Sequence, residues 1–108
     1  MPDQKKIAAL NDACRTHRAG QHVMTRGIAA EGLEFTAKCI AAVAVFNDFT
    51  DDNDPFGEHD FGAFTIDSVK CFWKIDIYAD TTLQFGSEHP DDPTRSFRVM
   101  TLMLAEEY

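Results

Sequence analysis

The chain has 108 residues, 44% of them hydrophobic and 11% aromatic, and a formal net charge of −8. This length and composition predict one compact globular domain spanning residues 1–108. The negative charge disfavours direct binding to nucleic acid or to an anionic membrane surface, since both need a basic footprint. The polar start MPDQKK, three cysteines without metal-ligand spacing and only short apolar runs predict a cytoplasmic protein with reduced, mostly buried thiols.

The N-terminal part predicts two helices around one short strand. Residues 3–18 predict an amphipathic helix capped by Asp3, with apolar spacing that extends to His17 and a stop at Gly20. Residues 21–26 predict a strand that ends at Gly27. Residues 33–46 predict a second, central buried helix. Its expected buried face consists of Leu33, Ala37, Ile40, Val43 and Ala44.

Beyond residue 60 the apolar period changes to two, which is typical of strands. Residues 61–66 and 71–78 predict a hairpin around Asp67–Ser68. Its second strand should turn Cys71, Trp73, Ile75 and Ile77 toward the core, and Phe72, Lys74, Asp76 and Tyr78 toward the other face. Residues 83–85 predict a further short strand, 86–96 a surface loop and 97–104 the last strand. The expected fold is α+β, with two helices packed on one face of a mostly antiparallel four- to five-stranded sheet.

The segment 47–62, NDFTDDNDPFGEHDFG, is the most unusual part of the chain. It holds six carboxylates, and no Lys or Arg occurs anywhere from Cys39 to Val69. Close like charges repel one another and oppose folding unless something compensates them. Interleaved phenylalanines are not expected in a purely solvated acidic tail. We therefore expect an ordered loop that presents negative charge on a rigid frame.

Several segments resemble the bacterial family of domain of unknown function 3768. They are ALNDACR, TRGIAAEG, NDFTDDNDPFGEHDFG, FWKIDIY and the terminal VMTLMLAEEY, which together cover nearly the whole chain. The resemblance implies a single compact cytoplasmic domain. It supplies no catalytic residue that could be transferred to this sequence.

The preferred functional hypothesis is a non-enzymatic, acidic interaction protein that needs no cofactor. Its partner would be a basic protein surface, such as that of a DNA- or RNA-binding complex, and the protein would act as an inhibitor that imitates the regular charge of nucleic acid. The residues expected to contact the partner are Asp51, Asp52, Asp54, Phe56, Glu58 and Asp60. Simple solubility is an alternative explanation of the same charges.

A second hypothesis is a metal-dependent hydrolase or metal-binding domain. Its ligands would come from the 51–60 loop, namely Asp52, Asp54, Glu58, His59 and Asp60, with Lys74 and Asp76 nearby on the sheet. The loop does not match the EF-hand pattern, and no nucleophile–base–orienter set is apparent in the sequence. A third possibility is a structural subunit of a larger assembly.

Overall fold

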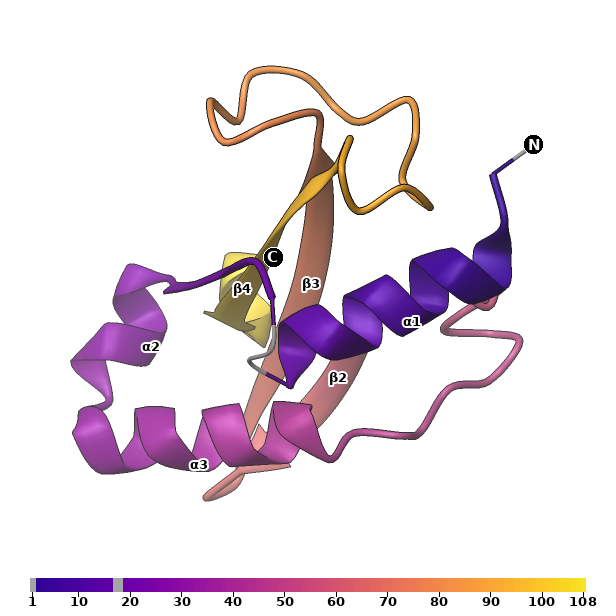
Figure 1. The fold of residues 1–108 in the computed structure, drawn as a ribbon. Coiled ribbons are helices and arrows are strands. Elements are labelled where there is room, and N and C mark those ends of the chain that lie inside the picture. Colours follow the sequence, from indigo (N-terminus) through magenta and orange to yellow (C-terminus); the bar gives the residue numbers. More distant parts are fainter. Residues whose placement is uncertain (1, 17–18) are drawn as a thin grey trace.

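The computed structural model of the chain describes residues 2–16 and 19–108. The α-helices and β1 lie in the first half of the chain, and the C-terminal half completes the sheet (Figure 1). In chain order the elements are α1 (Gln4–Arg15), β1 (Gln21–Met24), α2 (Arg26–Ala30), α3 (Leu33–Ala44), β2 (Phe61–Ile66), β3 (Val69–Tyr78), β4 (Phe97–Leu104) and the 3₁₀ turn η1 (Ala105–Glu107). The predicted α+β class is confirmed.

The four strands of the sheet follow the order β1-β4-β3-β2. β2 pairs with β3, and β3 with β4, in antiparallel fashion, whereas β1 lies parallel to β4. The sheet is therefore mixed but mostly antiparallel, as expected. The β2–β3 hairpin turns at Asp67 and Ser68, whose φ angles of 50° and 68° are the positive values that a tight two-residue hairpin turn requires.

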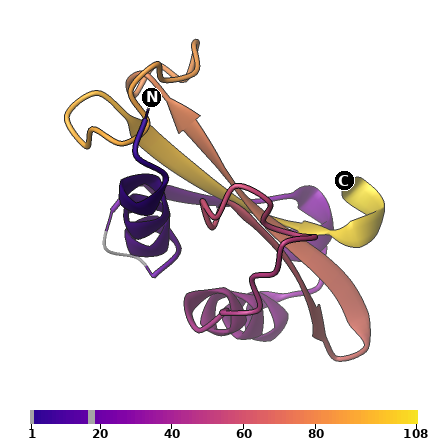
Figure 2. The same ribbon diagram turned by 90° about the vertical axis from the view of Figure 1, so that its right-hand side faces the viewer.

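The core lies between one face of the sheet and the helices. α1 and α3 lie on the same side of the sheet, and η1 lies at the opposite side (Figure 2). Alternate residues of β3 point into the core, as the sequence predicts, and Trp73 at its centre is fully buried. The buried cluster comprises Cys14, Ile28, Phe35, Cys39, Val43, Cys71, Trp73, Ile75, Met100, Leu102 and Leu104. All three cysteines are free and buried.

The packing of β2 against Trp73 depends on Gly62. A Cβ atom at this position would stand 2.3 Å from Trp73 Nε1 and 2.7 Å from Phe46 Cζ. Real Cβ atoms do not approach heavy atoms so closely, so only glycine fits here without movement of the indole or the Phe46 ring. This glycine lies at the end of the acidic segment and therefore helps to fix where that segment joins the sheet.

Two boundaries and one additional helix in the first half differ from expectation. α1 ends at Arg15, whereas the sequence predicts a helix to residue 18; His17 and the rest of that stretch lie outside the described residues. β1 ends at Met24, because the Thr25 hydroxyl accepts a hydrogen bond from the Ile28 amide and starts α2. Gly27 therefore belongs to a short helix that the sequence pattern did not indicate.

The buried face of α3 also differs from the predicted one. Phe35, Thr36, Cys39 and Val43 are buried, whereas Leu33 is 90% exposed. Leu33 precedes Phe35 by two residues, about 200° around a helix of 3.6 residues per turn, so the two side chains cannot share a face. The helix begins and ends almost where predicted, but only Val43 of the predicted face is fully buried.

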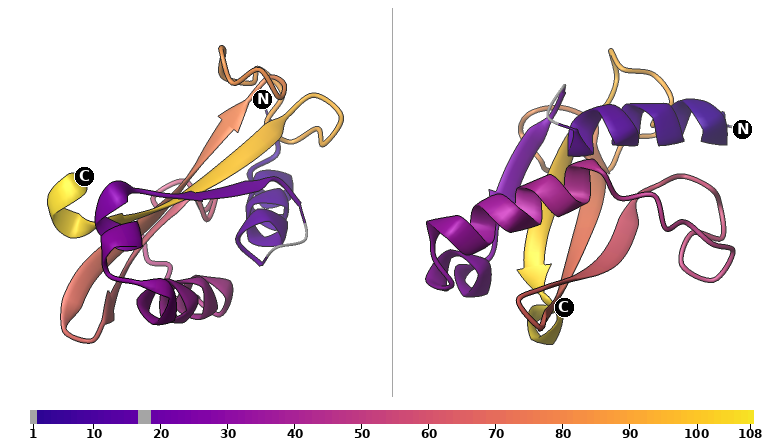
Figure 3. Two further views of the ribbon diagram at one scale, coloured as in Figure 1. Left: turned by 90° about the vertical axis from the view of Figure 1, so that its left-hand side faces the viewer. Right: turned by 90° about the horizontal axis from the view of Figure 1, so that it is seen from below.

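The connection between β3 and β4 contains no strand. The predicted strand over residues 83–85 is wrong, because Leu83 has a φ of 59°, which extended backbone excludes. A single bridge joins Tyr78 to Gly86 instead. The predicted surface loop extends past the end of the sheet that lies away from η1 (Figure 3).

Among the described residues, no α-helix covers the second face of the sheet, at which only the short η1 lies. Phe72, Lys74, Asp76 and Tyr78 are half-buried there, and the Lys74 Nζ and Asp76 Oδ2 atoms lie 3.2 Å apart. Tyr108 covers one end by packing on the Phe72 ring at 5.3 Å. Among the residues described, no helix has the length and apolar character that a membrane crossing needs.

Candidate functional site

The acidic loop, residues 47–60, is ordered by its own polar side chains. The Asp54 carboxylate is 8% exposed and accepts hydrogen bonds from the backbone amides of Glu58 and His59. Asn53 accepts a bond from the Thr50 amide and donates one to the Asp48 carbonyl. Asp and Asn side chains stabilise turns in this way by replacing backbone partners. Two of the polar residues therefore hold the loop in one shape.

The loop is attached to α1 along one side of the molecule (Figure 1). His59 Nδ1 lies 3.0 Å from an Asp12 carboxylate oxygen, and its Nε2 lies 3.8 Å from Asp54 Oδ2. The Asn11 side chain donates a 2.8 Å hydrogen bond to the Glu58 carbonyl. One imidazole thus lies between two carboxylates that belong to different elements, and it links the loop to the helix.

An aromatic contact connects the loop to the core. The Phe49 ring is stacked on His59, with centroids 3.9 Å apart and planes inclined by 3°. The same ring meets Phe46 and Trp73 edge-on at 5.0 and 6.2 Å. The Arg15 guanidinium lies 5.4 Å from the Phe49 centroid. Aromatic pairs of these geometries add stability beyond the area that they bury.

The six residues predicted to contact a partner fall into three groups. Asp51, Asp52 and Phe56 are exposed, and Phe56 is 66% accessible. Glu58 and Asp60 are half-buried near the start of β2. Asp54 faces inward and is occupied by the backbone amides, so we leave it out of the candidate contact surface.

The loop carboxylates are poorly compensated by basic groups. Asp48, Asp51, Asp52, Glu58 and Asp60 form no ion pair with any residue that the structure describes. Burial, followed by the charges of Asp60 and Asp54, raises the pKa of Glu58. Burial also raises the pKa of Asp60, and the charges of Asp54 and Asp76 add to the effect. The folded loop therefore holds two carboxylates in an environment that opposes their ionisation.

The second hypothesis required several loop carboxylates to converge on one point. Within residues 2–16 and 19–108, no group of three or more His, Cys, Asp or Glu side chains is arranged to hold a metal ion. His59 faces both Asp54 and Asp12, and Asp54 and His59 take part in the structure of the loop. The geometry gives the metal hypothesis no further support.

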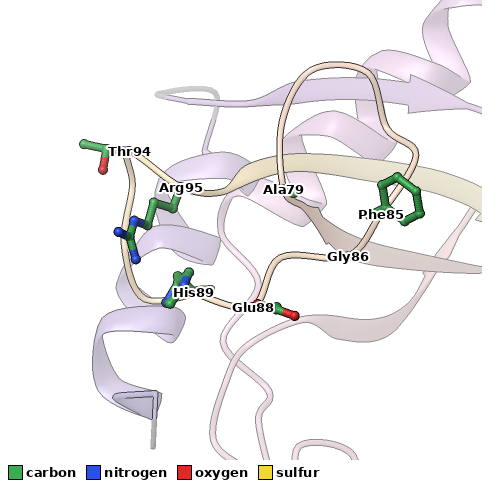
Figure 4. A pocket seen from close by; sticks show the side chains of 7 residues that line it. All are labelled: Ala79, Phe85, Gly86, Glu88, His89, Thr94 and Arg95. Carbon is green, nitrogen blue, oxygen red and sulfur yellow. The ribbon is translucent and has the colours of Figure 1, made fainter.

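Among the hollows outside the loop are two that sequence patterns did not indicate. One, of about 530 Å³, lies inside the 79–96 connection (Figure 4). It is lined by Ala79, Phe85, Gly86, Glu88, His89, Thr94 and Arg95. The other is a groove of about 570 Å³ on the open sheet face, with Lys74, Asp76 and Tyr108 among its lining residues. Their residues come together only through the fold, so neither has a local sequence signal.

The contact between Asp12 and His59 was also missed. The two residues are 47 positions apart in the sequence, and the residues around either one do not indicate that the other is its partner. Lys74 and Asp76 were foreseen as neighbours on one face, which strand alternation is sufficient to predict.

Comparison with known proteins places the chain in a family. No curated protein and no solved structure gives a significant match. A family model described as "Protein of unknown function (DUF3768)" matches residues 24–107, which include the acidic loop and all of β2, β3 and β4. Because the match spans most of the sequence, the chain belongs to this family.

Proposed function

We propose that the chain is a non-enzymatic interaction protein whose acidic loop binds a basic protein surface and imitates the charge of nucleic acid. The observation that carries the proposal is the pairing of order with uncompensated charge. The loop is pinned by Asp54, His59 and Phe49, yet five of its carboxylates, named above, lack a basic partner among the described residues.

The order of the acidic loop matters because a fixed array of charges can match a partner without the entropic cost of ordering the loop during binding. The exposed carboxylates of Asp51 and Asp52 lie in the same short loop as the exposed Phe56 ring. A large exposed aromatic side chain surrounded by charges is the composition expected of an interface anchor with a polar rim. The carboxylates would speed and orient the encounter, and the ring would supply apolar contact.

The raised pKa values of Glu58 and Asp60 support the same function. Their ionised forms are destabilised by burial and by neighbouring carboxylates. A cationic group from a partner would lower the pKa values of Glu58 and Asp60. At a pH above the ordinary pKa range of carboxylates, binding should therefore relieve the repulsion between these neighbouring carboxylates. A loop that served solubility alone would gain nothing from placing these two carboxylates in a half-buried position.

The test is a capture experiment with matched charge reversals. The immobilised protein is exposed to an extract of its native host, and the double variant Asp51→Lys/Asp52→Lys is compared with Glu31→Lys/Glu34→Lys. Both variants change the net charge equally, but the second pair is exposed where α2 ends and α3 begins, away from the loop. The loop variant should lose a basic protein that the control retains.

Two further arms separate the interaction from non-specific attraction. Capture should weaken as NaCl rises from about 0.05 M to about 0.3 M, because screening shortens the range of the charges. Duplex DNA added as competitor should displace the chain from its partner if the acidic loop occupies a nucleic-acid site. Equal capture by both reversal variants, or capture that ignores salt, would contradict the proposal.

A further inference from the structure

Arg98 is a buried cation that has no acidic partner in the part of the chain that the structure describes. It lies near the start of β4, is 5% exposed and reaches toward α1. Its Nε donates a 2.6 Å hydrogen bond to Asn11 Oδ1, Nη1 donates a 2.9 Å bond to Ser96 Oγ, and Nη2 donates to the Pro90 carbonyl. No carboxylate among the described residues forms an ion pair with it.

This arrangement leaves the guanidinium charge without a counter-charge. Arginine stays protonated in proteins, and a buried charge is costly unless it is paired. The three neutral acceptors take three of its five N–H groups, so two have no acceptor among residues 2–16 and 19–108. Cys14 lies close enough to interact with Arg98, but burial raises the pKa of its thiol to about 11. The thiol is therefore neutral near pH 7 and does not supply the missing negative charge.

A small cavity has Arg98 among its lining residues. Its volume is about 190 Å³, and it is bounded by α1, the turn at Ala19–Gly20 and the segment that enters β4. Leu10, Pro93 and Phe97 form apolar walls, while Ser96 and Arg98 are its polar side chains. None of the lining residues is acidic, so the cavity differs from the rest of this strongly negative molecule.

We propose that this cavity binds a short aliphatic carboxylate. The two remaining N–H groups of Arg98 match the two oxygens of a carboxylate, which arginine binds in a fork geometry. The walls of Leu10, Pro93 and Phe97 would enclose the hydrocarbon tail. The volume equals roughly six water molecules of liquid at about 30 Å³ each, which limits the ligand to roughly the size of butyrate. The site is separate from the acidic loop, and its occupancy does not depend on the function proposed for that loop.

Thermal denaturation in the presence of butyrate tests the proposal, with ionic strength held constant by exchange against chloride. Butyrate should raise the melting temperature with a saturating concentration dependence, because it binds the folded state. Butyramide has the same shape without the charge and should bind at least about tenfold more weakly, since hydrogen bonds between charged groups are the stronger class. Formate keeps the charge but lacks the tail, so it should also bind more weakly than butyrate. Equal effects of butyrate and butyramide would overturn the assignment.

Three variants locate the effect. Arg98→Met removes the charge but keeps most of the side-chain volume, and it should abolish the butyrate-dependent rise. Arg95→Met removes an exposed arginine from the neighbouring loop and should leave the rise unchanged. Leu10→Trp fills the cavity while the Arg98 contacts remain, and it gives a second test if Arg98→Met fails to fold. A rise that persists in a folded Arg98→Met or Leu10→Trp protein would show that butyrate acts elsewhere.

Discussion

Replacement of Phe49 by alanine tests whether the acidic loop is held by the core. The Phe49 ring is the contact through which His59 reaches Phe46 and Trp73. A fully buried phenylalanine costs about 3–5 kcal/mol when truncated to alanine. Because Phe49 is half-buried, we expect a loss of about 2–3 kcal/mol in the free energy of unfolding. For a chain of this length the melting temperature should fall by roughly 10 °C.

The two measurements are urea denaturation and amide hydrogen exchange. Exchange should accelerate most at the amides of Glu58 and His59, whose hydrogen bonds to Asp54 depend on the loop shape. Phe56→Ala is the matched control, because the same truncation at a 66% exposed ring should change stability by less than about 0.5 kcal/mol. If Phe49→Ala were as stable as this control and kept its slow amides, the loop would be held by other contacts.

The remaining predictions concern charge, packing and turn geometry. Burial and neighbouring charges raise the folded-state pKa of Glu58 and Asp60. The stabilising contribution of these two carboxyl groups is therefore present at pH values below the unfolded-state pKa, and it is lost as the pH rises through the folded-state pKa. Glu58→Gln and Asp60→Asn should therefore be more stable than the wild type near neutral pH, and urea denaturation as a function of pH should show the difference vanish in acid. Gly62→Ala should lose at least about 2 kcal/mol by driving a methyl group into the Trp73 indole, and an unshifted urea midpoint would contradict this packing. Ser68→Gly should gain about 0.5–1 kcal/mol because its φ of 68° suits glycine, and a loss of stability in thermal denaturation would count against the assigned turn.

Much of the secondary structure could be predicted because the signals are local. The apolar residues of 61–66 and 97–104 mark β2 and β4 at their observed bounds. Asp3 caps α1 through bonds to the next amides, as a residue of its type does at a helix start. Errors arose where two neighbouring residues had competing tendencies. Thr25 starts α2 inside the predicted strand over residues 21–26. The positive φ at Leu83 excludes the predicted strand over residues 83–85.

The candidate site was predicted only in outline. The sequence located the acidic loop and its phenylalanines, and it suggested that the loop would be ordered. It treated the six residues predicted to contact a partner as one set, because like charges in a row have no sequence feature that separates exposed from buried positions. The structure shows that Asp54 faces the backbone while Asp51 and Asp52 face solvent.

By itself the sequence determined most of the segments that form helices and strands, where the hairpin turns, and that negative charge is concentrated in residues 47–60. These features depend on capping, alternation and composition, which act over a few residues. Only the tertiary structure decided that His59 meets Asp12, that α3 buries Phe35 and not Leu33, and that Arg98 has no acidic partner among the described residues. Such contacts join residues far apart in the chain, and packing of the helices on the sheet selects them.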